Sequence, residues 1–221
     1  MRGAEAVLSK TTFIGRAAVV KSRIVKGYRV KELDSRLRSE RTRSEARLLH
    51  RAKLAGVDCP TVLCVDDFDI TMTFVSGKRP EMTKKQSYDA GAILAKLHAN
   101  DIIHGDYTPA NLVVSENKKT KKSELETTKP EKTEPESCAS GSAMPASGRG
   151  AGVGVLFVID FGLGFVSNDI EDKAVDVFTM LRALDGNEKK DGFVEGYRAY
   201  VKSDSVLKRV KDVEKRVRYA F

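Results

Sequence analysis

The sequence has few of the features that mark secreted, fibrous or membrane-spanning proteins. No apolar run approaches the roughly 20 residues that a membrane-spanning helix needs, and the N-terminal residues lack the basic and then apolar layout of a signal peptide. The cysteines (Cys59, Cys64 and Cys138) are odd in number and lack CxxC spacing, which argues against a disulfide framework or a cysteine metal site. These absences exclude collagen, coiled coils and disulfide miniproteins, and we expect a cytoplasmic protein that does not cross a membrane.

The chain does have the apolar content of a folded protein, together with an excess of basic residues. Its 221 residues are 41% hydrophobic, and 39 Lys and Arg against 31 Asp and Glu give a formal net charge of +8. This length suits one or two compact domains. A basic balance is compatible with partners that carry phosphate groups, but it is a weak signal, so function has to be inferred from motifs.

Hydrophobic periodicity indicates a β-rich first part and a helical second part. Short β-rich runs occur at Ala6–Ser9, Thr11–Ile14, Ala17–Arg23, Thr61–Val65 and Ile70–Val75. A helix is predicted at Leu33–Leu54 among them, and a second one follows the capping box of Thr83 and Gln86. Further on we expect a strand at Val153–Ile159, a helix at Ile170–Leu184 and a helical C-terminus. This order favours an α+β fold with two lobes, residues 1–75 and 76–221.

The composition changes sharply between about residues 115 and 152. This stretch is first charged and rich in Thr and Pro, then small and rich in Gly, with almost no large apolar side chains. Such a composition cannot offset its own ordering entropy, so we predict a disordered insertion within the second lobe.

Acidic and amide side chains in two short strings point to phosphoryl transfer. Asp106 and Asn111 lie five residues apart in a turn, and Asp160 ends an apolar strand on the other side of the insertion. If the strands beside them pair, these groups meet, and they supply oxygen ligands for Mg²⁺ together with one acid that can orient a nucleophile.

The first part of the chain offers cationic and backbone groups for phosphates. Lys21 ends an apolar strand, and Glu45 on the following helix could pair with it and position it. Gly3 precedes the first strand, where backbone N–H groups could approach phosphates. Lys21 taken alone is as well explained as a surface lysine, and only the combination favours a site.

The motifs together resemble known kinases. Lys21, Glu45, the HGD string ending at Asp106, Asn111 and the DFG string starting at Asp160 are similar to the protein-kinase set. A closer resemblance is carried by GAEA (3–6), VVKSRIVKGYR (19–29), LDSRL (33–37), RTRSEARLL (41–49), DIIHGD (101–106), IDFGLG (159–164) and EDKAVDVF (171–178). With these strings the chain resembles the small PRPK-type kinase/ATPase subunits of the KEOPS complex.

This resemblance implies a minimal two-lobed kinase fold that binds ATP and Mg²⁺. It also implies a role in forming threonylcarbamoyladenosine in tRNA, beside a threonylcarbamoyl-transferase subunit and other KEOPS subunits. By position, Lys21 would contact the α- and β-phosphates, Glu45 would pair with it, and Asp106 would orient a water or hydroxyl. Asn111 and Asp160 would bind Mg²⁺.

Some positions depart from the family pattern. Gly105 stands where most protein kinases have the arginine of HRD, and Met72-Thr73 stands where this family has a methionine-glutamate pair at the hinge. The second change removes an acid but keeps the backbone at Met72 that would meet adenine. The C-terminus lacks the expected basic tail, which puts contacts of that tail in doubt.

Two alternatives stay open. A small-molecule phosphotransferase of the aminoglycoside type shares HGD and a downstream asparagine, and a non-catalytic scaffold for tRNA or a partner would need none of these groups. Basic residues are dense between Arg16 and Lys53, and a solvated helix face explains them more simply than a tRNA-backbone surface.

Overall fold

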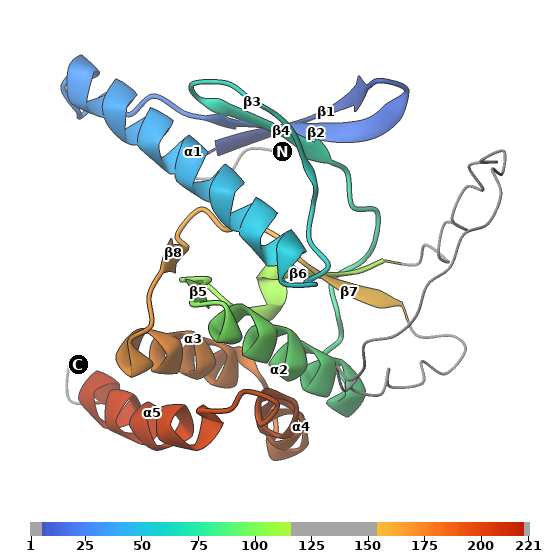
Figure 1. Cartoon of the computed structure of the whole chain (residues 1–221), viewed down its shortest axis with the longest axis vertical. Coiled ribbons are helices and arrows are strands. Elements are labelled where there is room, and N and C mark those ends of the chain that lie inside the picture. Colours follow the sequence, from blue (N-terminus) through green and yellow to red (C-terminus); the bar gives the residue numbers. More distant parts are fainter. Residues whose placement is uncertain (1–5, 116–153, 219–221) are drawn as a thin grey trace, which may run out of the picture.

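The computed structural model describes residues 6–115 and 154–218 of the chain. In the first part, four strands form an antiparallel sheet in the order β1–β2–β4–β3 (Figure 1). Their bounds are β1 Ala6–Phe13, β2 Arg16–Arg23, β3 Val62–Val65 and β4 Asp69–Thr73. Helix α1, Lys31–Leu54, follows β2 in the sequence and runs across this sheet. It starts two residues earlier than predicted.

The prediction of two separate runs before residue 15 was wrong, because β1 is one continuous strand. Lys10, the residue between the predicted runs, pairs with Val19 of β2, and its ammonium lies 4.8 Å from the centre of the Phe74 ring. No glycine or proline interrupts the strand there. Ile14 and Gly15 instead form a two-residue turn in which both have positive φ, 46° and 70°, as tight β-hairpin turns require.

The second part is mainly helical and carries short strand pairs. Its elements are α2 Lys84–Ala99, β5 Ile102–Ile103, the 3-10 turn η1 Pro109–Asn111, β6 Leu112–Ser115, β7 Val155–Val158, β8 Phe165–Val166, α3 Ile170–Ala183, α4 Asn187–Tyr197 and α5 Ser203–Arg218. The predicted capping box of Thr83 and Gln86 is present at the start of α2. Strand β6 pairs with β7, and β5 pairs with β8, both antiparallel.

Helices α2 and α4 pack very closely, and glycine makes this possible. A Cβ at Gly91 would lie 2.1 Å from the Phe193 carbonyl oxygen, and one at Gly196 would lie 2.0 Å from the Tyr88 carbonyl oxygen. Helix α5 closes the core with Val206, Val210 and Val213, which are buried. Among the described residues, no helix combines the length and apolar composition needed to cross a membrane.

The predicted insertion coincides almost entirely with residues 116–153, which lie outside the described part of the chain. On either side of it, Ser115 and Val155 are paired in the β6–β7 hairpin. Residues 1–5 and 219–221, which include Gly3, also lie outside the described ranges. The division into two lobes at residue 75 stays a prediction.

Candidate active site

Lys21 links the sheet, α1 and the chain after β7. Its Nζ lies 2.6 Å from Glu45 Oε1 and 2.7 Å from Asp160 Oδ1. Lys21 lies near the C-terminal end of β2. Glu45 faces it from the buried side of α1, where the Glu45 side chain is 1% exposed. The pairing of Lys21 with Glu45 expected from the sequence is therefore present, and Asp160 joins it from 139 residues away.

Asp160 is held in a conformation that non-glycine residues seldom adopt. Its φ is 61°, and its Oδ1 also accepts a hydrogen bond from the Gly162 N–H over 3.1 Å. Partial burial alone would raise its pKa, but the charge of Lys21 and the hydrogen bonds from Lys21 and Gly162 outweigh it and lower the pKa below its usual range. The side chain is 51% exposed, so this ionised carboxylate remains accessible to a ligand.

Asp106 and Asn111 form a compact pair at the turn before β6. The Asn111 Nδ2 donates to the backbone carbonyl of Asp106 over 2.8 Å and to its Oδ2 over 2.9 Å. The Asn111 carbonyl accepts from the N–H of Ile159, directly before Asp160. The pairing of β6 with β7 across the insertion thus brings Asn111 beside Asp160, as the sequence predicted.

A buried carboxylate fixes the backbone of this turn. Asp176 on α3 is 1% exposed, and it accepts hydrogen bonds from the N–H of His104 over 2.6 Å and of Gly105 over 2.8 Å. The φ of Gly105 is 80°, and a Cβ there would lie 2.4 Å from the Leu163 carbonyl oxygen. These constraints explain why glycine replaces the usual arginine at this position.

Two buried histidines complete the support of the turn. His104 Nδ1 accepts from the Asp106 N–H over 3.3 Å, which leaves its Nε2 to donate to the Ile159 carbonyl over 3.2 Å. His98 on α2 lies 2.7 Å from the Tyr197 hydroxyl and 3.4 Å from Asp176. Burial is the main cause that lowers the pKa of both histidines, so both are neutral near pH 7.

Arg23 is a member of the charged cluster that the sequence analysis did not identify. Its Nη2 lies 2.6 Å from Glu45 Oε2, so Glu45 is shared by two cations, Arg23 and Lys21. The sequence did offer one signal for it. Arg23 lies two residues after Lys21 on β2, and residues two apart on a strand face the same side. In the sequence Arg23 was one of many basic residues, and its buried partner was not evident.

Met72 is the residue that the sequence predicts to meet adenine. Met72 lies in β4 opposite Val19 of β2 and is buried, which places it beside the strand that carries Lys21. Within the described ranges, no group of three or more His, Cys, Asp or Glu side chains is arranged to hold a metal ion. The sequence predicts Asp160 and Asn111 as metal ligands, and a metal bound by these two alone would need further ligands from outside the chain.

Comparison with known proteins decides the family. The chain is 35% identical over 208 residues to a protein of Archaeoglobus fulgidus named as a probable serine/threonine-protein kinase BUD32 homolog, covering 91% of this chain and 88% of that protein. The chain belongs to the BUD32 family. No protein-family model matches it.

Other relatives of this BUD32-family chain are longer. It is 33% identical over 231 residues to a Methanococcus maripaludis protein named as a probable bifunctional tRNA threonylcarbamoyladenosine biosynthesis protein, covering 99% of the chain but 36% of that protein. The chain therefore spans about a third of the length of such bifunctional relatives. These relatives confirm the KEOPS-type kinase/ATPase family that the sequence motifs indicated.

Solved structures confirm the fold of the BUD32-family chain. The Rio2 kinase of Chaetomium thermophilum superposes with a TM-score of 0.59 at 14% identity, covering 100% of this chain and 72% of that one. At this identity the likeness concerns the fold alone. The α+β, protein-kinase-like class and the kinase type of enzyme predicted from the sequence are both confirmed by these comparisons.

Proposed function

We propose that this chain binds Mg-ATP at the cluster of Lys21, Asn111 and Asp160 and transfers or hydrolyses its terminal phosphate in support of tRNA threonylcarbamoyladenosine formation. The observation that carries the proposal is the position of Lys21 Nζ, within 2.7 Å of both Glu45 and Asp160. An ammonium held by two carboxylates is fixed in place and can exchange one of them for phosphate oxygens.

In this proposal Lys21 binds the α- and β-phosphates, and Glu45 keeps it oriented. Since Arg23 also holds Glu45, the carboxylate stays in place when Lys21 turns toward a nucleotide. The backbone at Met72 is assigned to adenine and the backbone at Gly3 to the phosphates, as the family resemblance implies.

The donor atoms present fit a magnesium ion. Asp160 offers an ionised, half-exposed carboxylate, and Asn111 uses its Nδ2 for Asp106, which leaves the Oδ1 without a hydrogen bond from any described residue. Mg²⁺ prefers such oxygen ligands and commonly takes only one or two of them from protein, with waters and phosphates completing the set. When bound, it neutralises charge on the phosphate oxygens.

Asp106 is assigned the role of orienting the attacking water or hydroxyl. Its Oδ2 accepts from Asn111, and its backbone is fixed through His104, so the remaining carboxylate oxygen has a defined direction. The chain passes from Gly162 to the start of α3 in only seven residues, 163–169. This short connection provides little platform for a peptide substrate, which favours water or a closely bound partner as the acceptor.

We assign the tRNA and transferase context from the names of the relatives. Bifunctional relatives carry the matched region within a longer chain, so we propose that a threonylcarbamoyl-transferase, with other KEOPS subunits, acts beside this one. We also propose that tRNA takes part in the assembly. ATP turnover would then depend on these partners.

Release of ADP by the full chain tests the proposal. We expect slow, magnesium-dependent release by the chain alone and faster release when the transferase subunit and tRNA are added. Stimulation by aminoglycosides instead would identify a small-molecule phosphotransferase. Absence of ADP release under every condition would identify a scaffold.

A further inference from the structure

Tyr197 lies behind the turn that carries Asp106, and no role described above uses it. It ends α4, its side chain is fully buried, and its hydroxyl lies 2.7 Å from His98 Nδ1 on α2. His98 Nε2 lies 3.4 Å from Asp176 Oδ2 on α3. Asp176 accepts from two backbone N–H groups just before Asp106. A chain of polar contacts therefore leads from α4 through α2 and α3 to the proposed catalytic residue.

Close packing of α2 on α4 brings this hydroxyl to the imidazole. The two helices lie side by side (Figure 1), and glycine at 91 and 196 removes the side chains that would hold them apart. The Tyr197 ring packs edge-on against the His98 ring, with centroids 5.5 Å apart, and stacks on Phe193 at 6.4 Å. The position of the phenol is thus fixed by the helix contact and by its aromatic neighbours.

The hydrogen-bond partners of His98 decide which of its ring nitrogens carries the proton. Both oxygens of Asp176 accept backbone N–H groups, as a carboxylate does, so His98 Nε2 is the donor toward it. A neutral imidazole has one N–H, which leaves Nδ1 as an acceptor. Burial is the main cause that lowers the pKa of His98 and raises the pKa of Tyr197, so the imidazole is neutral and the phenol keeps its proton near pH 7. The Tyr197 hydroxyl is therefore the donor to Nδ1.

The other charged and titratable groups around His98 do not bond to its ring. Lys173 on α3 donates to Asp101 over 2.7 Å and to the Tyr200 hydroxyl over 3.0 Å. The Tyr200 ring packs against the His98 ring with centroids 6.2 Å apart. Lys173 lowers the pKa of His98 and Asp101 raises it, and both effects are smaller than that of burial. Among the described residues, the state of Nδ1 therefore depends on the α4 hydroxyl.

We propose that Tyr197 is a positioning residue for phosphoryl transfer, which acts by holding His98 in the tautomer that donates to Asp176. Without the hydroxyl, Nδ1 loses the bond that favours its lone pair and takes up a proton more readily. An imidazolium binds a carboxylate more strongly than a neutral ring does, and it would compete with the His104 N–H for the same oxygen, Asp176 Oδ2. The turn would lose part of its support, and Asp106 would lose its direction. The effect on turnover rests on the proposed function, whereas the tautomer rests on the geometry of the cluster.

The test compares changes of tyrosine to phenylalanine, which remove one hydroxyl and keep the ring. Tyr197→Phe removes the bond to His98. Tyr200→Phe is the matched control, because it removes a buried hydroxyl that bonds to Lys173 and not to the imidazole. A difference between these two variants therefore reports the bond to Nδ1 rather than the loss of a buried hydroxyl.

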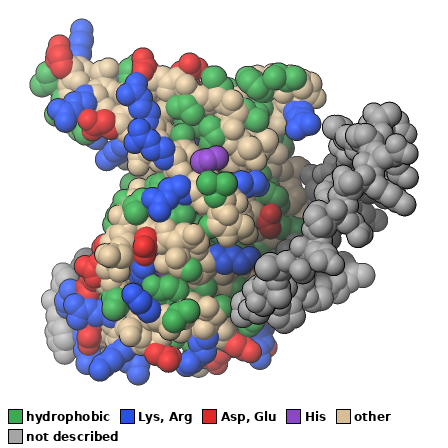
Figure 2. Space-filling model, in the orientation of Figure 1, with side chains coloured by type: hydrophobic (Ala, Val, Ile, Leu, Met, Phe, Trp, Pro, Cys, Tyr) green, Lys and Arg blue, Asp and Glu red, His purple; other side chains and the backbone are tan. Residues whose placement is uncertain are grey.

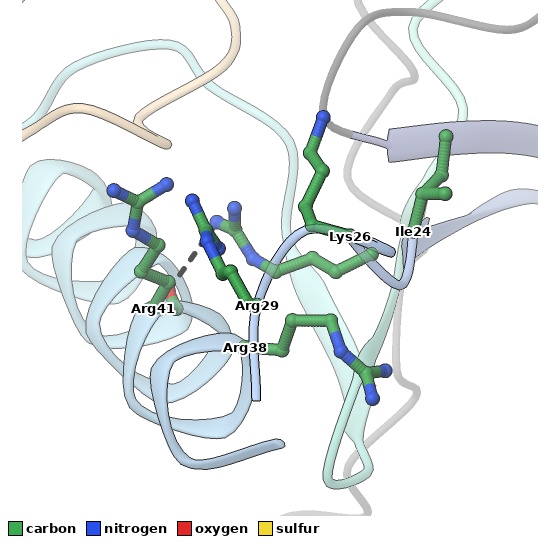
Figure 3. A pocket seen from close by; sticks show the side chains of 6 residues that line it. Ile24, Lys26, Arg29, Arg38 and Arg41 are labelled. Carbon is green, nitrogen blue, oxygen red and sulfur yellow. Dashed lines mark hydrogen bonds between the residues drawn. The ribbon is translucent and has the colours of Figure 1, made fainter. Parts of the chain in front are cut away.

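Exposed residues supply reference signals. Tyr28→Phe removes an exposed hydroxyl, which accepts from Arg29 Nη2 over 3.2 Å at the β2–α1 connection drawn in Figure 3. This variant should behave as the parent does in every measurement. His50 is exposed on α1, and Figure 2 shows histidine at the molecular surface. Its ring nitrogens give the NMR shifts of a solvated imidazole within the same spectra.

The ¹⁵N shifts of the imidazole nitrogens, the amide shifts of the turn and magnesium-dependent ADP release are measured between about pH 6 and 8. In the parent and in Tyr200→Phe, Nδ1 of His98 should stay unprotonated. In Tyr197→Phe it should gain a proton as the pH falls, and the amide shifts of His104 and Gly105 should move with it. At the acid end, kcat should be about tenfold lower than in the parent. KM for ATP should be unchanged, since the described groups assigned to the nucleotide are not bonded to Tyr197.

A protonated Nδ1 of His98 in the parent would overturn the proposal without any variant, so the proposal stays falsifiable even if Tyr197→Phe does not fold. Unchanged ring-nitrogen and turn-amide shifts in Tyr197→Phe would also overturn it, as would an equal loss of kcat in Tyr200→Phe. Absence of ADP release by the parent would contradict the proposed function. The NMR shifts would still decide, in that case, whether Tyr197 sets the tautomer and supports the turn.

Discussion

Arg23 donates from its guanidinium to the buried Glu45 carboxylate over 2.6 Å, on the opposite oxygen from the one that contacts Lys21. Glu45 therefore stays neutralised if Lys21 moves.

Replacing Arg23 should destabilise the protein. In Arg23→Met, Glu45 keeps Lys21 but loses a charged hydrogen bond in a buried position, so we expect the free energy of unfolding to fall by about 2 kcal/mol. Urea denaturation measures it. Arg43→Met on the same helix breaks an exposed pair with Asp67 and should change stability by less than about 0.5 kcal/mol. Equal losses in the two variants would contradict a special role for the buried bond.

Replacing Asp160 should remove magnesium-dependent nucleotide binding. Asp160→Ala deletes the exposed carboxylate assigned to the metal, and calorimetric titration with Mg-ATP should show no magnesium-dependent component. Asp185→Ala, which removes an exposed acid after α3, is the matched control and should bind as the parent does. Unchanged affinity and hydrolysis in Asp160→Ala would count against the metal assignment.

An alanine at Gly91 should disrupt the packing of α2 on α4. Its Cβ would lie 2.1 Å from the carbonyl oxygen of Phe193, a backbone atom that can move only if the helices separate. We expect a loss of about 2 kcal/mol in unfolding free energy, since overpacking outweighs the better helix propensity of alanine. Gly27→Ala has no atom within 4 Å of the new Cβ and should leave stability unchanged or slightly raised. Thermal melts that fail to separate the two variants would refute the packing argument.

Acid should weaken the fold through its buried histidines. The pKa of both His98 and His104 is lowered in the folded state, so the unfolded chain binds more protons, and stability falls as the pH drops below about 6.5. Each histidine contributes at most about 1.4 kcal/mol per pH unit to this loss. Urea denaturation between pH 7 and 5 should show a smaller pH dependence in His98→Gln than in the parent. His50→Gln, at an exposed position of α1, should keep the parent's dependence, and an unchanged slope in His98→Gln would contradict the assignment.

Much of the site could be predicted because its residues carry local patterns. Lys21, Asp106, Asn111 and Asp160 each sit at a strand end or turn with a characteristic string, and strand pairing across the insertion then places Asn111 beside Asp160. The long helices were also evident from periodicity and from the capping box before α2. Their roles toward ATP and Mg²⁺ stay predictions.

Other features depend on how distant elements meet, which local patterns do not report. Whether Arg23 faces solvent or Glu45 is decided by the placement of α1 against β2. The tight contact at Gly91 depends on the path of α4, and the continuity of β1 through Lys10 depends on pairing with Val19. Each of these is settled by tertiary packing rather than by the propensity of a short segment.

The register of the β6–β7 hairpin has a practical use. Since Ser115 and Val155 are partners across the ladder, the chain departs from the hairpin and rejoins it at adjacent points. The intervening stretch could be exchanged for a fluorescent reporter or an affinity label whose own termini are close together. Such an exchange should not pull β6 and β7 apart. The tip of this hairpin is thus a suitable grafting position for following the protein in its assemblies.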